Sequence, residues 1–166
     1  MVKSWKNSYS TWGPSYKVSF SLNIKKIPKN QYTNIIHVTK GGNWGHYGDR
    51  IPAVWILSKW GRLELYICSA ITFRYRRNWK VSIREKKSFC KKFNVSLEKK
   101  YDVTIQQSKQ SGHYWYQLFV SGERNRSFVN YRPKKFNNVK CYTSDPWFPS
   151  FTSDLGTVSN LRIENQ

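Results

Sequence analysis

The sequence predicts an all-β protein, an antiparallel sandwich or barrel, and three observations lead to that prediction. Apolar and polar residues alternate with a period of two over several segments, as in strands with one buried face. No stretch of a dozen residues keeps the period of an amphipathic helix. Turn-forming pairs such as Ser111-Gly112 and Ser121-Gly122 separate the segments at the short spacing typical of sandwiches and barrels.

The clearest alternation lies in the first thirty residues, where Tyr16, Val18, Phe20, Leu22 and Ile24 are separated by polar residues. We expect a half-buried strand there. Residues 1–14, which precede it, are expected to be an extension or a first strand. Further strands are expected at 35–39, 51–57 and 63–67, where β-branched and aromatic residues recur between turn signals at 28–30 and 41–43.

The second half of the chain continues in the same way. Strands are expected at 79–84 and 90–97, which are rich in β-branched or aromatic residues. The alternation is clear again at 101–105 and 114–120, and shorter segments follow at 139–141 and 158–164. We therefore expect ten or so short strands, and we find no internal repeat.

Length and charge limit the class of protein. A chain of 166 residues without a Gly/Ser/Pro-rich linker is expected to form one domain over residues 1–166. It carries 29 Lys and Arg against 9 Asp and Glu, a formal net charge of +20. Such a charge favours an anionic partner, because it otherwise repels itself. The aromatic content of 17% indicates a packed core and argues against a disordered basic tail.

The cysteines leave the redox state open. Cys68, Cys90 and Cys141 are an odd number at wide spacing, which favours neither a dense disulfide framework nor a zinc site. One disulfide with a free thiol, or three buried thiols, would both fit. No apolar run reaches the roughly 18 residues of a membrane span. The first residues lack the apolar stretch of a signal peptide, so we expect either an intracellular protein or a mature secreted form.

Several motifs follow one another along the chain: NIIHVT at 34–39, GGN at 41–43, YGDRIPAVW at 47–55, LYICSA at 65–70, FNNVK at 136–140, SDPW at 144–147 and NL at 160–161. In this order they resemble the laminin-G-like, concanavalin A-like jelly rolls of invertebrate extracellular proteins. The resemblance covers most of the chain from Tyr16 onward. It implies an antiparallel two-sheet jelly-roll sandwich in a secreted or cell-surface setting, and it leaves the ligand open.

One segment departs from the resemblance. The family pattern implies a second cysteine soon after the Cys-Ser-Ala motif, whereas residues 71–79 read ITFRYRRNW. The expectation is that a short-range disulfide is missing here and that a basic, aromatic surface has taken its place.

The basic residues form two groups. Eleven Lys or Arg lie between Arg74 and Lys100, interleaved with aromatic residues; Arg74 and Arg76 are expected to share one strand face and Arg77 the opposite one. A second group follows the turn at 121–122. Arg offers bidentate donors to sulfate, phosphate and carboxylate, and Lys adds a point charge. The candidate ligand-binding residues of the two groups are Arg74, Arg76, Arg77, Trp79 and Lys80, then Arg124, Arg126, Lys134 and Lys135. Any single one could instead be a solvated outer-face residue.

A glycine-rich loop at 41–48 supplies candidate stacking residues. Trp44, His46 and Tyr47 lie there, where exposure costs less than in a strand and binding residues concentrate. A ring in this loop could stack on a sugar face or a base, or fold back over the end of the sandwich.

Acidic residues and histidines give little support to catalysis. Glycoside hydrolysis needs two carboxylates flanking the bond, and Glu64 is the single acid of its predicted strand. The scattered His37, His46 and His113 show no nucleophile or ligand spacing. Asp49 and Asp145 are weak candidates for calcium, which prefers several oxygen ligands; their neighbours Gly and Pro indicate turn residues instead. We expect no enzyme and no other cofactor.

These observations predict an extracellular, non-catalytic, lectin-like module that binds anionic, sulfated or uronic-acid polysaccharide. The alternative is a structural matrix or biomineral-associated protein that assembles on an anionic scaffold or on silica. Nucleic-acid binding ranks lower, because charge alone supports it. Asn94-Val95-Ser96 and Asn125-Arg126-Ser127 fit the acceptor pattern for N-glycosylation. The oligomeric state stays open.

Overall fold

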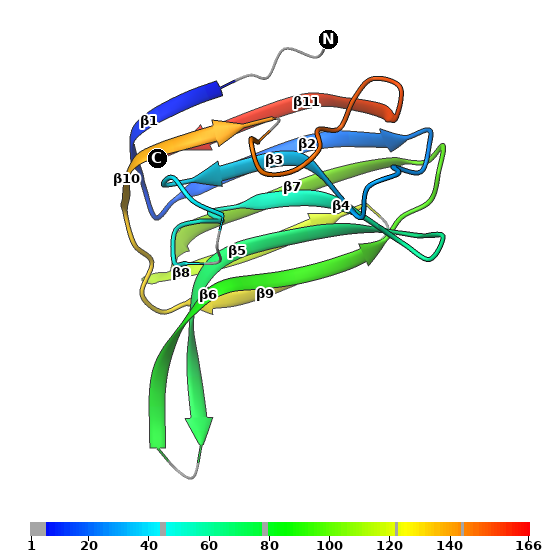
Figure 1. Ribbon diagram of the computed structural model, residues 1–166. Helices are drawn as coiled ribbons and strands as arrows, with labels where there is room; N and C mark the ends of the chain where they lie inside the picture. Colours follow the sequence, from blue (N-terminus) through cyan, green and yellow to red (C-terminus); the bar gives the residue numbers. More distant parts are fainter. Residues whose placement is uncertain (1–5, 44–45, 78–79, 122, 144) are drawn as a thin grey trace.

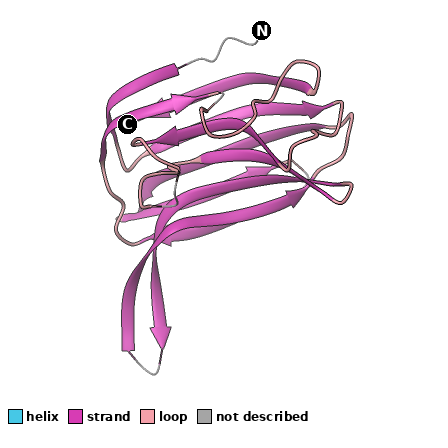
Figure 2. Ribbon diagram, viewed as in Figure 1, coloured by secondary structure: helices cyan, strands magenta, loops and turns pink. Residues whose placement is uncertain are grey.

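The computed structural model describes residues 6–43, 46–77, 80–121, 123–143 and 145–166, and within these ranges the backbone alone of residues 6, 73, 75–77, 80–88 and 123–125. The described residues form eleven strands and no helix (Figure 2), so they include no helix that could cross a membrane. The strands are β1 (Lys6–Trp12), β2 (Tyr16–Ile24), β3 (Tyr32–Thr39), β4 (Ala53–Lys59), β5 (Arg62–Arg77), β6 (Lys80–Asn94), β7 (Lys100–Gln110), β8 (His113–Val120), β9 (Glu123–Asn130), β10 (Phe136–Tyr142) and β11 (Gly156–Asn165).

The strands form two antiparallel sheets that pack face to face (Figure 1). One sheet has six strands in the order β1-β10-β3-β4-β5-β6, and the other has five in the order β11-β2-β7-β8-β9. Every strand pair within the sheets is antiparallel. The predicted all-β, antiparallel two-sheet architecture is therefore confirmed.

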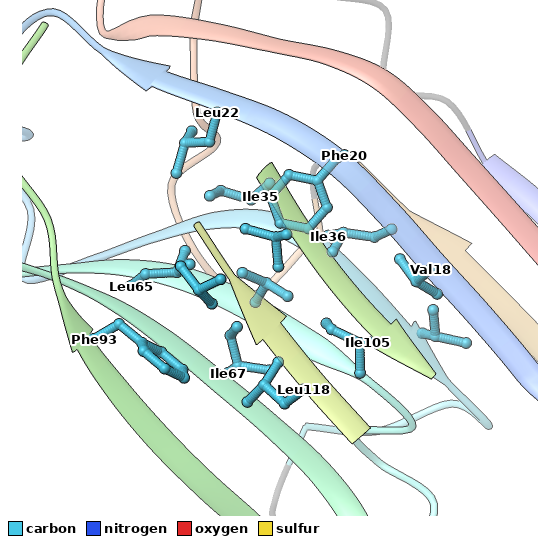
Figure 3. Packing of buried hydrophobic residues seen from close by; sticks show 14 of the residues in the cluster. Val18, Phe20, Leu22, Ile35, Ile36, Leu65, Ile67, Phe93, Ile105 and Leu118 are labelled. Carbon is cyan, nitrogen blue, oxygen red and sulfur yellow. The ribbon is translucent and has the colours of Figure 1, made fainter. Parts of the chain in front are cut away.

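The core lies between the sheets and follows from the alternation. Val18, Phe20, Leu22 and Ile24 point inward from β2 and are at most 2% exposed. Side chains from β5, β7 and β8 meet them (Figure 3). Because each strand contributes every second residue, the buried face comes directly from the period-two pattern.

A second buried layer covers the outer face of the six-stranded sheet. The connection from β10 to β11 runs beside β3, where Asn34 bridges Ser150, and it packs Phe148 on Trp55 with ring centroids 5.7 Å apart. Trp55 is 1% exposed in this layer, with Ala53 and Cys68. Trp55 is thus buried, but it lies outside the main core.

Several predicted boundaries were wrong. Residues 79–84 and 90–97 were predicted as two strands, whereas one strand, β6, runs through Lys80–Asn94. It pairs with a β5 of 16 residues, longer than the predicted strand at 63–67. The prediction missed β9, whose arginines suggested only a basic patch. Of the two possibilities for residues 1–14, the first strand is correct for Lys6–Trp12.

The ends of β5 and β6 next to their connection, residues 73–77 and 80–84, form a two-stranded arm that extends beyond the sheets (Figure 1). Cys68 and Cys90 lie opposite each other next to its base and form a disulfide. Of the two possibilities for the cysteines, one disulfide with a free thiol is therefore correct, and the disulfide is not the short-range one that the family pattern implies. The partner of Cys68 is 22 residues away because the arm lies between the two cysteines. Cys141 is a buried free thiol.

Candidate functional site

The first basic group lies on the arm. Arg74 is exposed on β5, and the pairing register places its backbone opposite Ile83. Arg76, Arg77 and Lys80 belong to the paired backbone of the same arm, since Arg76 pairs with Val81 and Arg77 with Lys80. Trp79 lies outside the described residues. The backbones of Arg74, Arg76, Arg77 and Lys80 therefore lie close together on the arm.

The second basic group is divided by the fold. Arg124 and Arg126 belong to β9, and Arg126 pairs with Leu118 in the middle of β8. Lys134 and Lys135 are exposed in the connection from β9 to β10, beyond the other end of β9. The sequence groups these residues because they are close along the chain, whereas the fold directs them to two places.

The structure brings the glycine-rich loop to Lys134. The Lys134 Nζ lies 4.7 Å from the centroid of the Tyr47 ring, a cation–π distance, and the Tyr47 ring packs on Phe136 at 5.6 Å. His46 is exposed beside Tyr47, and Trp44 lies outside the described residues. Tyr47 is half-buried, so its ring partly folds back over this end of the sandwich.

A small hollow opens beside this pair. Trp12, Tyr16, Tyr47, Lys134 and Phe136 line it together with two amide side chains, Gln107 and Asn130. Sequence reasoning missed Gln107 and Asn130, which come from β7 and β9, two strands of one sheet that are separated by β8. Their side chains are fixed, because the Asn130 amide donates to Gln107 at 2.8 Å and the Gln107 amide donates to the Pro14 carbonyl at 2.6 Å. The hollow therefore has mainly aromatic and apolar walls, two amides that are bonded within the protein, and a cation at its side.

The base of the arm is attached to this same end. The Thr72 N–H donates to the Asn130 Oδ1 at 3.1 Å, and the Thr72 carbonyl accepts the N–H of Tyr131 at 3.1 Å. The Thr72 hydroxyl also donates to the Arg132 carbonyl at 3.3 Å. These bonds join β5, just before Arg74, to the segment that carries Lys134. The arm, Lys134 and Tyr47 thus belong to one end of the sandwich.

The two calcium candidates are organised around a histidine. The Nδ1 of His37 lies 2.7 Å from Asp145 Oδ2, and its Nε2–H donates to the Asp49 carbonyl at 2.6 Å; all three residues are buried. The Asp145 Oδ1 accepts the N–H groups of Trp147 and Phe148, and the Asp49 carboxylate accepts the N–H of His46. Both carboxylates therefore perform the turn-forming role, in agreement with the turn interpretation.

Other acids are dispersed. Glu64 lies 3.6 Å from the Lys92 Nζ on the outer face of the six-stranded sheet. Among the described residues, no three His, Cys, Asp or Glu side chains gather in a group that could hold a metal ion. His37 is a buried strand residue with both ring nitrogens engaged, as its position in a predicted strand suggested.

Solved structures share the fold. An alginate lyase from Pseudomonas aeruginosa superimposes with a TM-score of 0.53 at 13% identity, over 94% of this chain and 68% of the lyase chain. A native heptameric SAP-like pentraxin from Limulus polyphemus gives 0.49 at 12% identity, over 98% and 71% of the two chains. No protein-family model and no curated protein matches the sequence. At 13% identity the likeness to the lyase shows the fold alone, and that fold is the antiparallel concanavalin A-like jelly roll.

Proposed function

We propose that this protein is a non-catalytic, lectin-like module that binds an anionic polysaccharide, sulfated or uronic, at the end of the sandwich that carries the arm. The observation that carries the proposal is the cation–π contact between Lys134 and the Tyr47 ring. This contact lies next to the hollow and to the base of the arm. Cations for the acid groups and a ring for a sugar face are groups that such a ligand requires.

Electrostatic capture is the mechanism. The net charge of +20 attracts a polyanion over the screening length, and the Arg residues of the arm then orient sulfate or carboxylate groups. No step of turnover is required. An alginate lyase shares the fold, but the proposal rests on charge and on the residues of this end rather than on that likeness.

An extracellular setting belongs to the same proposal. The laminin-G-like order of the sequence motifs supports it, and so does the Cys68–Cys90 disulfide, since disulfides persist in oxidising compartments. The exposed Asn94 in its acceptor triplet would be available for glycosylation there.

Two triple variants test the site. Arg74→Ala, Arg76→Ala and Arg77→Ala together should weaken binding to a sulfated polysaccharide by about tenfold more than Lys25→Ala, Lys26→Ala and Lys29→Ala, which remove the same charge at the opposite end. Both variants should melt near the wild-type temperature, because exposed charges contribute little to stability. Binding is measured at two salt concentrations, and the polymer's length is checked afterwards. Equal losses in the two variants, or shortening of the polymer, would contradict the proposal.

A further inference from the structure

The edge strands of the two sheets are β6, the most basic strand of the fold, and β9. β6 carries six Lys or Arg against one Glu, and β9 carries two Arg against one Glu. They belong to different sheets, yet they run along the same edge of the sandwich (Figure 1), where the rings of Phe89 and Phe128 touch with centroids 4.9 Å apart. Two like-charged strands therefore face each other at one rim.

Lys91 is placed at this rim by the register. It pairs with Ile67, whose side chain points into the core (Figure 3), so Lys91 lies on the inner side of β6. Its Nζ lies 5.7 Å from the Phe93 ring, and the residue is partly exposed. Lys92, the next residue, lies on the opposite face, where its ammonium group forms an ion pair with the Glu64 carboxylate. Lys91 and Lys92 thus have different surroundings.

Arg126 is placed in the same way on β9. It pairs with Leu118, a core residue, and therefore lies on the inner side of its strand, but it is exposed because β9 is the edge. Lys91 and Arg126 each lie two residues beyond the Phe89–Phe128 contact, on the side away from the arm. The segments 89–94 and 126–130 contain no acid. Each edge strand thus carries one inward-facing cation at the rim of the core.

We propose that this rim is a track for an extended anionic polymer, which lies between β6 and β9 and continues onto the arm. The polymer would neutralise charges that otherwise repel one another across the rim. Fifteen residues of β6 at about 3.3 Å each give a track of about 50 Å. The track therefore selects long polyanions over short ones. This inference rests on the proposed function, and it names the length and path of the ligand.

The test pairs a size series of sulfated oligosaccharides with a double variant, Lys91→Gln and Arg126→Gln. For the wild type, affinity should rise with oligomer length until the chain spans about 50 Å. In the double variant, affinity for the long polymer should fall by about tenfold, while affinity for a disaccharide changes little. Lys25→Gln with Lys29→Gln is the control for charge, and Lys91→Arg with Arg126→Lys should restore binding. Melting temperatures verify that each variant is folded.

The outcomes separate the two proposals. If the wild type binds no sulfated polymer, both fail. If the wild type binds and the arm triple variant weakens binding, but Lys91→Gln with Arg126→Gln behaves as the charge control, the track alone is wrong. Inward charges on edge strands also deter pairing between molecules. If the double variant self-associated in sedimentation and bound the polymer as the wild type does, the role of Lys91 and Arg126 would be to prevent association between molecules. The proposal of a polymer track would then be wrong.

Discussion

The protein buries side chains in two layers that are built differently. Between the sheets, strands from both sides contribute alternate aliphatic and aromatic residues to one large cluster. On the outer face of the six-stranded sheet, the buried cluster is small, and its cover is a single connecting segment that carries Phe148. Asp145, at the start of that segment, is held to His37 by a buried hydrogen bond. The inner layer rests on a repeated pattern, whereas the outer layer depends on a few polar contacts.

The strongest way to break the outer layer is to remove Asp145. Asp145→Ala leaves the His37 Nδ1 and the N–H groups of Trp147 and Phe148 without their acceptor in a buried place. Loss of one partner of such a buried pair typically costs about 3–5 kcal/mol. Denaturant unfolding, monitored by Trp fluorescence, measures the free energy of unfolding.

Asp145→Asn is the matched control, because it keeps an oxygen for the two N–H groups and replaces only the charged oxygen that faces the His37 Nδ1 with an NH2 group. It should cost less than half as much as Asp145→Ala. If both variants were as stable as the wild type, the cover would not depend on this contact.

The inner layer is tested by cavity formation. Ile67 is 1% exposed on β5 between the sheets, and Ile67→Ala should cost about 3 kcal/mol, within the range typical of large-to-small changes in cores. The same unfolding measurement applies. Because the neighbouring side chains come from both sheets, the loss should be cooperative over the whole sandwich. A transition that splits into two steps would indicate that the layers unfold separately.

Alkaline pH should have a smaller effect on the stability of the folded state. Burial raises the pKa of the Cys141 thiol to about 12, and burial also raises the pKa of Tyr16 and Tyr116. The folded state keeps these groups protonated where the unfolded state loses their protons. Stability should therefore be complete below about pH 9 and fall above it, by about 1 kcal/mol for Cys141 between about pH 9 and pH 10.

Thermal melts at a series of pH values measure the loss of stability at alkaline pH, with Cys141→Ala as the comparison. This variant should show a shallower decline than the wild type. In the native state the Cys141 thiol should also resist alkylation, since the thiolate is the reactive form. Rapid labelling at neutral pH, with the melt unchanged, would contradict the buried position.

Much of the inner layer could be predicted from the sequence, because period-two alternation is local. Tyr16 through Ile24 mark β2 without any knowledge of its partners. The extent of β5 and β6 could not be predicted in this way, since residues 73–84 form an arm that extends beyond the sheets, where no alternation of buried and exposed positions marks a strand. The strand β9 could not be recognised from the sequence, because its arginines interrupt the alternation of apolar residues at an exposed edge.

The candidate site was predictable only in part. Lys134 and the aromatic loop were each recognised from composition, but their contact depends on how β3, β9 and β10 pack. Gln107 and Asn130 carry no signal at all in a single sequence, because a glutamine and an asparagine in strands are ordinary until the fold joins them. Lys91 and Lys92 look alike in sequence, and only the register assigns them to opposite faces.

The Cys68–Cys90 disulfide allows the arm to vary in sequence while the sandwich stays the same. It closes residues 69–89 into a ring whose two ends are fixed on adjacent strands. A hairpin inside such a ring can change length or composition while the strands on either side keep their register, because exposed hairpin tips tolerate insertion. The arm is therefore a position where one scaffold could acquire different ligand preferences, and grafting a hairpin of another charge between these cysteines should alter binding without refitting the core.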